Sequence, residues 1–189
     1  MKRIAIFASG KGSNAENIIK YFKNSNKIEI QLVASNNSKS EALDRAKQHG
    51  VKVFVFNKIE LANGTLLREL KLHKIDFIVL AGFLLKIPKK IINAYLNNII
   101  NIHPSLLPLY GGKGMYGIYV HEQVSKSQDL ETGITIHYVN EIYDDGAIIF
   151  QAKCALYRNT KAKEIQKKVH KLEIKFFPRV IENLLDVKN

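Results

Sequence analysis

The sequence predicts an α/β fold: a mostly parallel, Rossmann-like twisted sheet with helices on both faces and antiparallel strands in the C-terminal half. Short apolar, β-branched runs alternate with helical patterns up to about residue 102, which is the rhythm of parallel strands joined by crossover helices. Beyond residue 130, two strand patterns follow each other with only a turn between them, which predicts an antiparallel pair.

The predicted strands of the first half are short apolar segments: Lys2–Ala8, Glu29–Ser35, Val51–Phe56, Phe77–Ala81 and Ile99–Ile102. The predicted helices between them have apolar residues at helical spacing: Asn14–Lys23, Ser38–His49, the segment around Leu66–His73, and one from Pro88 to about Tyr95. Ser38 and Glu41 have the spacing of a capping box, and Gly50 is a stop signal for that helix.

The second half has a different pattern, beginning with a loop rich in proline and glycine over Pro104–Gly117. Its predicted elements are a short helix carrying His121 and Val124, strands over Thr132–Val139 and Ala147–Lys153, and a long helix over Thr160–Leu185. We expect residues 1–189 to form a single domain, in which a nucleotide-fold half over 1–100 is completed by a half over 101–189.

The composition is that of an ordinary soluble globular protein, with 46% hydrophobic and 24% charged residues in a chain of 189. The apolar run at the N-terminus is too short for a signal peptide, because Gly10, Lys11 and Gly12 interrupt it. No segment has the length of a membrane span, and the single cysteine, Cys154, excludes an internal disulfide. We therefore expect a cytoplasmic protein with no membrane partner.

The net charge of +12 raises the possibility of nucleic-acid binding. Most lysines, however, occur singly on helical patterns, as they do over 161–175, and no basic run alternates with aromatic residues. The sequence therefore favours solvated helix faces and no nucleic-acid partner. A positive field of this kind suits the attraction of phosphorylated small substrates.

The loop after the first predicted strand, Ser9–Asn14, has the features of a phosphate site. Its glycines let the backbone approach a ligand closely, and the helix N-terminus that follows offers free N–H groups to an anion. Ser13 and Asn14 add side-chain donors or cap the helix, and a plain tight turn is the alternative interpretation. After the second strand come Asn36 and Asn37, with no carboxylate to bind the ribose hydroxyl of NAD. The spacing of a Walker loop, which binds ATP, is also missing. A single sugar phosphate therefore fits better than NAD or ATP.

Asn101 and His103 lie at the end of the fifth predicted strand, and their spacing places both on one side of it. An amide donor beside an imidazole suits stabilisation of an oxyanion with a proton source nearby, although a histidine before a proline is more often structural. The loop between the last two strands carries acids, including Asp144 and Asp145. One of them is expected to orient His103 and raise its pKa; an acidic turn is the alternative.

The motif Asn-Ile-His-Pro-Ser-Leu-Leu-Pro at 101–108, followed by Asp-x-Gly-x-Ile from residue 144, resembles the folate-dependent formyltransferase superfamily. With the Gly-Ser-Asn loop at 12–14 and the length of the chain, it is similar to the small monofunctional phosphoribosylglycinamide formyltransferases. The resemblance extends from Ile4 to about Pro178. It implies transfer of the formyl group of the co-substrate 10-formyltetrahydrofolate to the amine of 5-phosphoribosylglycinamide, a step of purine synthesis.

The resemblance also implies a set of site residues. The expected catalytic residues are Asn101, His103 and Asp144, and the expected contacts to the substrate phosphate are Gly12, Ser13 and Asn14. Glu173 is expected to hold the glycinamide part, with His170 one helical turn before it on the same face. The expected folate contacts are Leu84, Leu85, Lys86, Ile87, Asn101, Glu141, Ile142 and Tyr143. The histidines show no zinc spacing, so no metal is expected.

The chain departs from many members of the family at the folate site, where an arginine is replaced by Leu85. Lys86 and Arg68 are candidates for the contact to the folate glutamate. The glycine-rich stretch Tyr110–Tyr119 is longer than in several relatives, and we expect it to be mobile and to close over the substrate.

Several other functions fit parts of the sequence. The nearest are formyl enzymes that act on initiator tRNA or an amino sugar, or that hydrolyse the formyl group; the tRNA and hydrolase types normally carry a further domain, which we do not expect here. A non-catalytic nucleotide- or RNA-binding module and an NAD-dependent oxidoreductase represent other classes. We expect a monomer or a homodimer whose only ligands are small molecules.

Overall fold

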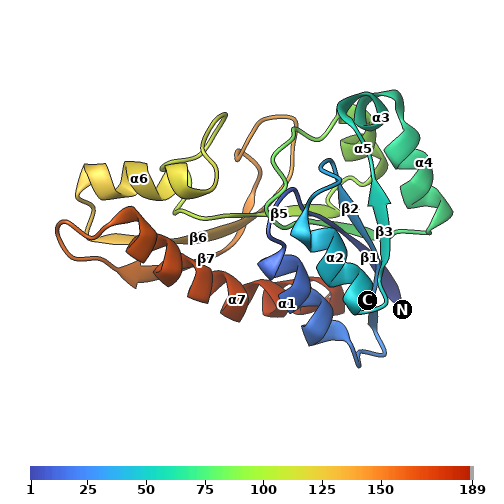
Figure 1. Cartoon of the computed structure of the whole chain (residues 1–189), viewed down its shortest axis with the longest axis horizontal. Coiled ribbons are helices and arrows are strands. Elements are labelled where there is room, and N and C mark those ends of the chain that lie inside the picture. Colours follow the sequence, from blue (N-terminus) through green and yellow to red (C-terminus); the bar gives the residue numbers. More distant parts are fainter. Residues whose placement is uncertain (188–189) are drawn as a thin grey trace. The chain divides into compact units, whose positions relative to one another are not determined.

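The computed structural model describes residues 1–187, and its strands form a seven-stranded sheet in the order β3-β2-β1-β4-β5-β6-β7 (Figure 1). The chain divides into two compact units, Met1–Ile100 with residues 185–187, and Asn101–Leu184. The boundary lies within β5 (Ile99–His103). The expectation that the whole chain forms one domain stays a prediction.

The first unit is built around parallel strands. β1 (Lys2–Phe7) pairs in parallel with β2 (Ile28–Ser35) on one side and with β4 (Phe77–Leu80) on the other, and β2 pairs in parallel with β3 (Lys52–Val55). β1 lies between two paired strands, and its apolar residues from Ile4 to Phe7 are 0% exposed, as expected of a parallel strand covered on both faces. The predicted parallel sheet is confirmed.

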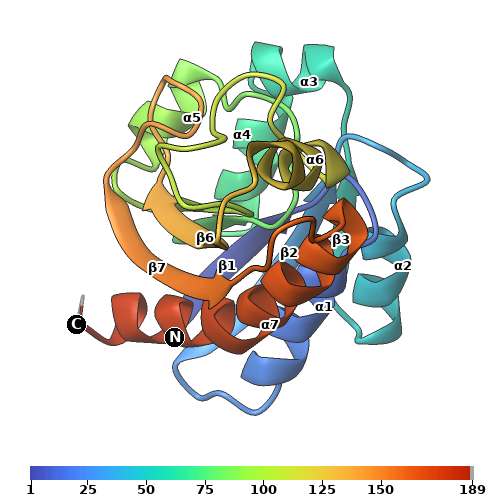
Figure 2. The same cartoon turned by 90° about the vertical axis from the view of Figure 1, so that its left-hand side faces the viewer.

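Helices cover both faces of this parallel part of the sheet. From β1 to β3 the chain moves towards one edge of the sheet, and the connecting helices are α1 (Ser13–Phe22) and α2 (Glu41–Gln48). From β3 to β5 it moves towards the other edge, and the connecting helices are α3 (Lys58–Asn63), α4 (Thr65–Leu72) and α5 (Lys89–Ala94). Because crossover connections are right-handed, reversing direction moves the helices to the opposite face. Figure 2 shows α1 and α2 on one side of these strands and α4 and α5 on the other.

The start of α2 differs from the prediction. The helix begins at Glu41 with Ser40 at the N-cap, so the capping box expected from Ser38 and Glu41 is wrong. Ser40 does not cap the helix with its side chain, and its Oγ donates instead to the carbonyl oxygen of Gly10 at 2.8 Å. A serine that had the right spacing for a local cap is thus used to hold the loop after β1.

α3 lies in a segment for which no helix is predicted, although its capping signal is present in the sequence. The Asn57 side chain accepts from the N–H groups of Ile59 and Glu60, and the Asn57 N–H donates to the Glu60 carboxylate at 2.8 Å. This is a complete capping box, which stabilises a helix too short to show clear periodicity.

The second unit contains the antiparallel strands. β6 (Glu131–Tyr138) pairs antiparallel with β7 (Ile148–Ala155), as predicted, and the two lie side by side in Figure 1. Its helices are α6 (Ile118–Ser127) and most of α7 (Ala162–Val187). Pro178 lies inside α7, and the helix continues through it. The turn between the strands requires a glycine at Gly146, because a Cβ there would lie 1.7 Å from the Tyr138 carbonyl oxygen.

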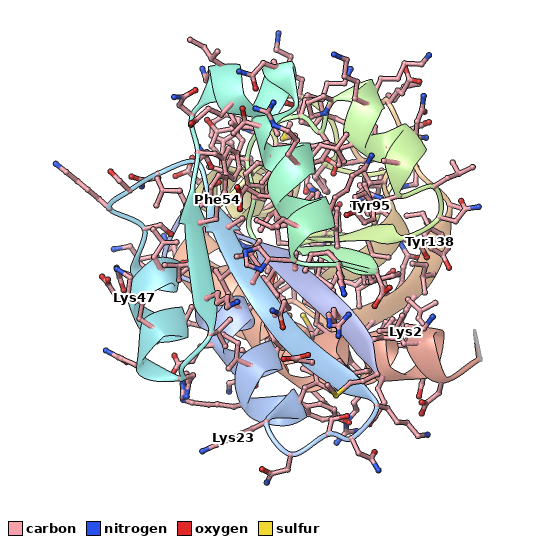
Figure 3. All side chains as sticks on the ribbon, turned by 90° about the vertical axis from the view of Figure 1, so that its right-hand side faces the viewer. Lys2, Lys23, Lys47, Phe54, Tyr95 and Tyr138 are labelled. Carbon is pink, nitrogen blue, oxygen red and sulfur yellow. The ribbon has the colours of Figure 1, made fainter. Side chains whose placement is uncertain are left out.

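Exposed lysines are dispersed over the first unit. Figure 3 shows Lys23 and Lys47 extending outwards from the ends of α1 and α2. Some cations are paired locally, since Arg45 forms an ion pair with Glu16 and Lys47 lies 3.9 Å from Asp44. Among residues 1–187, no helix combines the length and apolarity that crossing a membrane requires.

The loop between β1 and α1 requires glycine at position 12 but not at position 10. Gly12 has φ 73, and a Cβ there would lie 2.4 Å from Ala42 Cα in α2, whereas a Cβ at Gly10 would meet nothing within 4 Å. We expect Gly12→Ala to lower the free energy of unfolding by about 3 kcal/mol, through overpacking and positive φ. Gly10→Ala, the matched control, is expected to change it by less than about 1 kcal/mol. Urea denaturation of both variants measures the difference, and equal losses would contradict the packing argument.

Candidate active site

Two of the three predicted catalytic side chains come from the end of β5. In this extended strand Asn101 and His103 project to the same side, while Ile102 between them is 5% exposed and lies in the core. The imidazole itself is also buried, since His103 is only 3% exposed. A polar ring in such a place needs partners for both of its nitrogens.

Tyr110 supplies the partner of Nε2, and Asp144 lies on the side of Nδ1. His103 Nδ1 lies 3.4 Å from Asp144 Oδ2, and His103 Nε2 lies 2.8 Å from the carbonyl oxygen of Tyr110. Because a carbonyl oxygen only accepts, Nε2 carries a proton and donates to it. The structure therefore brings the predicted histidine and carboxylate together and leaves Nδ1 facing the carboxylate.

Burial controls the charge of His103 and corrects one expectation. Burial lowers the pKa of His103 below its ordinary value, although the charge of Asp144 and the bond to Tyr110 act in the opposite direction. From the nearby acid alone, a raised pKa of His103 is expected. The difference arises because the depth of the imidazole, which costs its cation the solvation of water, is a property of the folded chain.

Asp144 is held in one orientation from several sides. Its Oδ2 accepts from the Gly112 N–H at 2.9 Å, and its backbone has the left-handed φ of 55. Burial raises its pKa, but the contact with His137, the charge of His103 and the Gly112 N–H outweigh this and lower the pKa below the usual range. The carboxylate is therefore charged when it faces the imidazole.

His137, which lies in β6, is a further member of this cluster. Its Nδ1 lies 2.8 Å from the Tyr138 carbonyl oxygen, so it is protonated there and its Nε2 accepts from Asn101 Nδ2 at 3.1 Å. Asn101 Nδ2 also donates to Asp144 Oδ1 at 3.4 Å. The signal in the sequence is a histidine at an inward-facing strand position shortly before an acidic loop.

The predicted phosphate loop lies in the first unit at the N-terminus of α1. Gly12 is the N-cap residue with left-handed backbone, and no side chain caps the helix there. The first N–H groups of an α-helix have no intrahelical partner, so Ser13 and Asn14 present their N–H groups at the start of α1. Asn36, at the position where a dinucleotide enzyme carries its acid, accepts from Ser9 Oγ at 2.6 Å.

Ser9 joins the phosphate loop to the predicted folate segment, and no motif identifies it. Besides donating to Asn36, its Oγ accepts from the Leu84 N–H at 3.2 Å, and its own N–H donates to the Gly82 carbonyl oxygen at 3.0 Å. Leu84 is 45% exposed and Ile87 is 4% exposed. The ends of β1 and β4 are thereby tied together by one small, buried side chain.

The predicted folate loop in the second unit is exposed and braced from within. Ile142 is 63% exposed and Tyr143 is 36% exposed, and Glu141 is exposed as well. Asn140 accepts from the Ile142 N–H at 2.8 Å and donates to Asp145 at 3.0 Å. Apolar side chains held outwards in this way are available to an aromatic ligand.

The predicted pair on α7 is in contact. His170 Nδ1 lies 3.0 Å from Glu173 Oε2, as the spacing of one helical turn predicts, and this bond raises the pKa of His170. The charge of Glu173 also acts to raise the pKa of His103 and of His121. Glu173 thus lies within electrostatic range of the catalytic cluster. Over residues 1–187 no group of acidic, histidine and cysteine side chains is arranged to hold a metal ion.

These elements are those of an established family. The model of the formyl transferase family matches residues 2–181, and the chain belongs to that family. The phosphoribosylglycinamide formyltransferase of Bacillus subtilis (strain 168) is 34% identical over 100% of this chain and 97% of that protein. The chloroplastic phosphoribosylglycinamide formyltransferase of Arabidopsis thaliana is 36% identical over 95% of this chain, but the chain covers only 64% of its length.

The fold agrees with that of a solved structure. The crystal structure of phosphoribosylglycinamide formyltransferase from Anaplasma phagocytophilum superposes with a TM-score of 0.90 at 31% identity, covering 98% of this chain and 87% of that one. The resemblance inferred from the Asn-Ile-His-Pro-Ser-Leu-Leu-Pro motif is therefore confirmed along the whole chain.

Buried histidines give the protein a predictable response to acid. His121 is 3% exposed, its Nδ1 has no hydrogen-bond partner, and burial lowers its pKa from 6.5 to about 4. Between these values the unfolded chain binds a proton that the folded chain does not, so stability falls as pH falls from 6.5 to about 4.

We expect His121→Leu to remove about 3 kcal/mol of this acid-dependent loss. Denaturant unfolding from pH 7 down to pH 4 measures it: the curve for the variant should be flatter than that of the unchanged protein. Parallel curves would show that His121 is protonated equally well in both states.

Proposed function

We propose that the protein transfers the formyl group of 10-formyltetrahydrofolate to the amine of 5-phosphoribosylglycinamide. The products are formylglycinamide ribonucleotide and tetrahydrofolate, and the step belongs to de novo purine synthesis. The observation that carries the proposal is the buried cluster in which Asn101, His103 and Asp144 meet. The name of the Bacillus subtilis relative, which the chain matches over 97% of its length, supports the choice of amine.

The reaction exchanges one C–N bond for another. The amine nitrogen attacks the formyl carbon, the bond from that carbon to N10 of the folate breaks, and one proton moves from the attacking nitrogen to N10. The tetrahedral intermediate carries a negative oxygen. We assign the Asn101 amide as the donor to that oxygen, and the positive charge that His103 gains during the reaction as its electrostatic partner, because fixed charges and dipoles in a buried site act more strongly than in water.

His103 is proposed to enter this cycle as the neutral imidazole. Its Nε2–H is committed to the Tyr110 carbonyl oxygen, so Nδ1 is the nitrogen that takes up a proton. Asp144 Oδ2, 3.4 Å from Nδ1, stabilises the imidazolium that results and the proton is then returned to the leaving nitrogen. Burial favours the neutral His103 ring before the reaction. The charge of Asp144 stabilises the protonated ring that forms during the reaction.

The other proposed contacts follow from where each segment presents its groups. Gly12, Ser13 and Asn14 bind the substrate phosphate with helix N-terminal N–H groups, and Glu173 with His170 holds the glycinamide part. The folate contacts are Leu84 to Ile87 and Glu141 to Tyr143, with Asn101 at the formyl group. The co-substrate supplies the activated one-carbon unit, and a metal has no part in the proposed steps.

Removing the carboxylate tests the core of this assignment. We expect Asp144→Asn to lower kcat by about 10²- to 10⁴-fold while the fold survives, because the imidazolium then lacks its counter-charge. Asp145→Asn, one residue along the same loop, removes an equal charge and is expected to keep most of the activity.

The assay follows formation of formylglycinamide ribonucleotide by chromatography, with an amino sugar and the unphosphorylated glycinamide riboside as competing amines. Near-normal turnover by Asp144→Asn would refute the acid–base role. Faster formylation of another amine would refute the assignment of 5-phosphoribosylglycinamide as the substrate.

The state of His103 predicts the pH dependence of kcat. A buried imidazole that acts as a proton acceptor must be neutral, so kcat should stay level as pH falls through about 6.5 and decline only below it. Steady-state assays at saturating concentrations of both substrates, between pH 5 and pH 8, measure this dependence of kcat on pH. A kcat that instead declines as pH rises from about 6.5 would show that the reaction requires the imidazolium from the start.

A further inference from the structure

The orientation of His103 depends on an unusual backbone conformation at Tyr110. The carbonyl oxygen that accepts from His103 Nε2 at 2.8 Å belongs to a tyrosine whose φ is 55. Bulky residues rarely adopt this left-handed region, because Cβ then crowds the backbone. A tyrosine in such a conformation must be held there by contacts elsewhere.

The Tyr110 side chain provides that contact. Its Oη donates to Asp129 Oδ2 at 2.6 Å, just ahead of β6, and burial together with this bond raises the pKa of the phenol. Both residues line a cavity of about 230 Å³ with Leu106 and Leu130 among its walls. The hydrogen bond to Asp129 is therefore a contact that holds the phenol in place at the edge of this cavity.

The chain before Tyr110 is held independently of this bond. Thr135 Oγ1 accepts from the Leu107 N–H at 2.9 Å, Gln151 donates to the Leu107 carbonyl oxygen at 3.0 Å, and Ser105 Oγ donates to the Leu109 carbonyl oxygen at 2.7 Å. Loss of the bond between Tyr110 and Asp129 therefore leaves the segment up to Leu109 in place.

The chain after Tyr110 turns directly to the other catalytic group. The Gly112 N–H donates to Asp144 Oδ2, the same oxygen that faces His103 Nδ1. A Cβ at Gly111 would lie 2.5 Å from Leu107 Cδ2, so the turn fits closely against the fixed segment. One short turn thus contacts both members of the proton-transfer pair.

We infer that Tyr110 and Asp129 are positioning residues that hold the Tyr110 carbonyl against His103 Nε2 and so select which imidazole nitrogen exchanges the proton. This inference rests on the proposed function for its effect on turnover, but its effect on the imidazole does not. The titratable groups around the ring are Asp144, His137 and Glu173, with His121 beyond them. Asp144 lies against Nδ1, and Nε2 is given to the Tyr110 carbonyl.

The direct test is ¹⁵N NMR of the histidine rings, which separates the two neutral tautomers by the shifts of their nitrogens. The peak of His103 is identified by its loss in His103→Gln. In the unchanged protein we expect the Nε2–H tautomer. In Tyr110→Phe and in Asp129→Ala, which breaks the same bond while keeping the tyrosine, we expect a mixture of tautomers.

Turnover gives the second readout. Both variants should lose about 10- to 100-fold in kcat, with KM changed by no more than about threefold, because a displaced catalytic group costs rate rather than binding. Asp129→Asn keeps an acceptor oxygen and should restore both the tautomer and most of the rate. Tyr157→Phe, at an exposed tyrosine of the β7–α7 connection, is the matched control and should match the unchanged protein.

An unaltered Nε2–H tautomer in both Tyr110→Phe and Asp129→Ala would overturn the inference, whatever their turnover. A rate loss that Asp129→Asn does not restore would also overturn it. If the unchanged protein formylates no glycinamide ribonucleotide, the proposed function fails, and the tautomer measurement still decides the positioning role.

Discussion

The buried imidazole of His103 is the group around which the second unit is arranged. Removal from water favours its neutral form, while Asp144 beside it favours the cation, and the balance leaves a ring ready to gain a proton when the reaction provides one. Such a balance requires fixed distances, because Coulomb energies in a buried site change steeply with separation. The hydrogen bonds around the cluster supply that rigidity.

Rigidity is obtained by using backbone groups at uncommon conformations. Tyr110 and Asp144 both have a left-handed backbone, with φ 55 in each case. Tyr110 contacts the Nε2 of His103, and Asp144 faces its Nδ1. Strained residues of this kind concentrate at functional sites, where the surrounding structure holds them in place. His137 adds to this by accepting from Asn101 Nδ2, which fixes the side of the amide on which the nitrogen lies.

The first unit provides binding groups by a different principle. Its parallel strands end together, so loops distant in sequence become neighbours without any specific pairing signal. Ser9 makes this explicit, since one hydroxyl connects the chain after β1, after β2 and after β4. The N-terminus of α1, which no side chain caps, and the exposed Leu84 both follow the points where those strands end.

The sequence by itself determined the alternation of strands and helices, the antiparallel pair and the family, because period, turn residues and the Asn101–Pro108 motif are local signals. It did not reveal α3, whose short length hides its periodicity, and it misassigned the cap of α2, because Ser40 bonds to Gly10 across the fold. Only the tertiary structure decided that His103 has a lowered pKa, that His137 orients Asn101, and that Asp129 holds Tyr110. Each of these depends on burial or on contacts between residues far apart in the chain, which no local pattern of residues encodes.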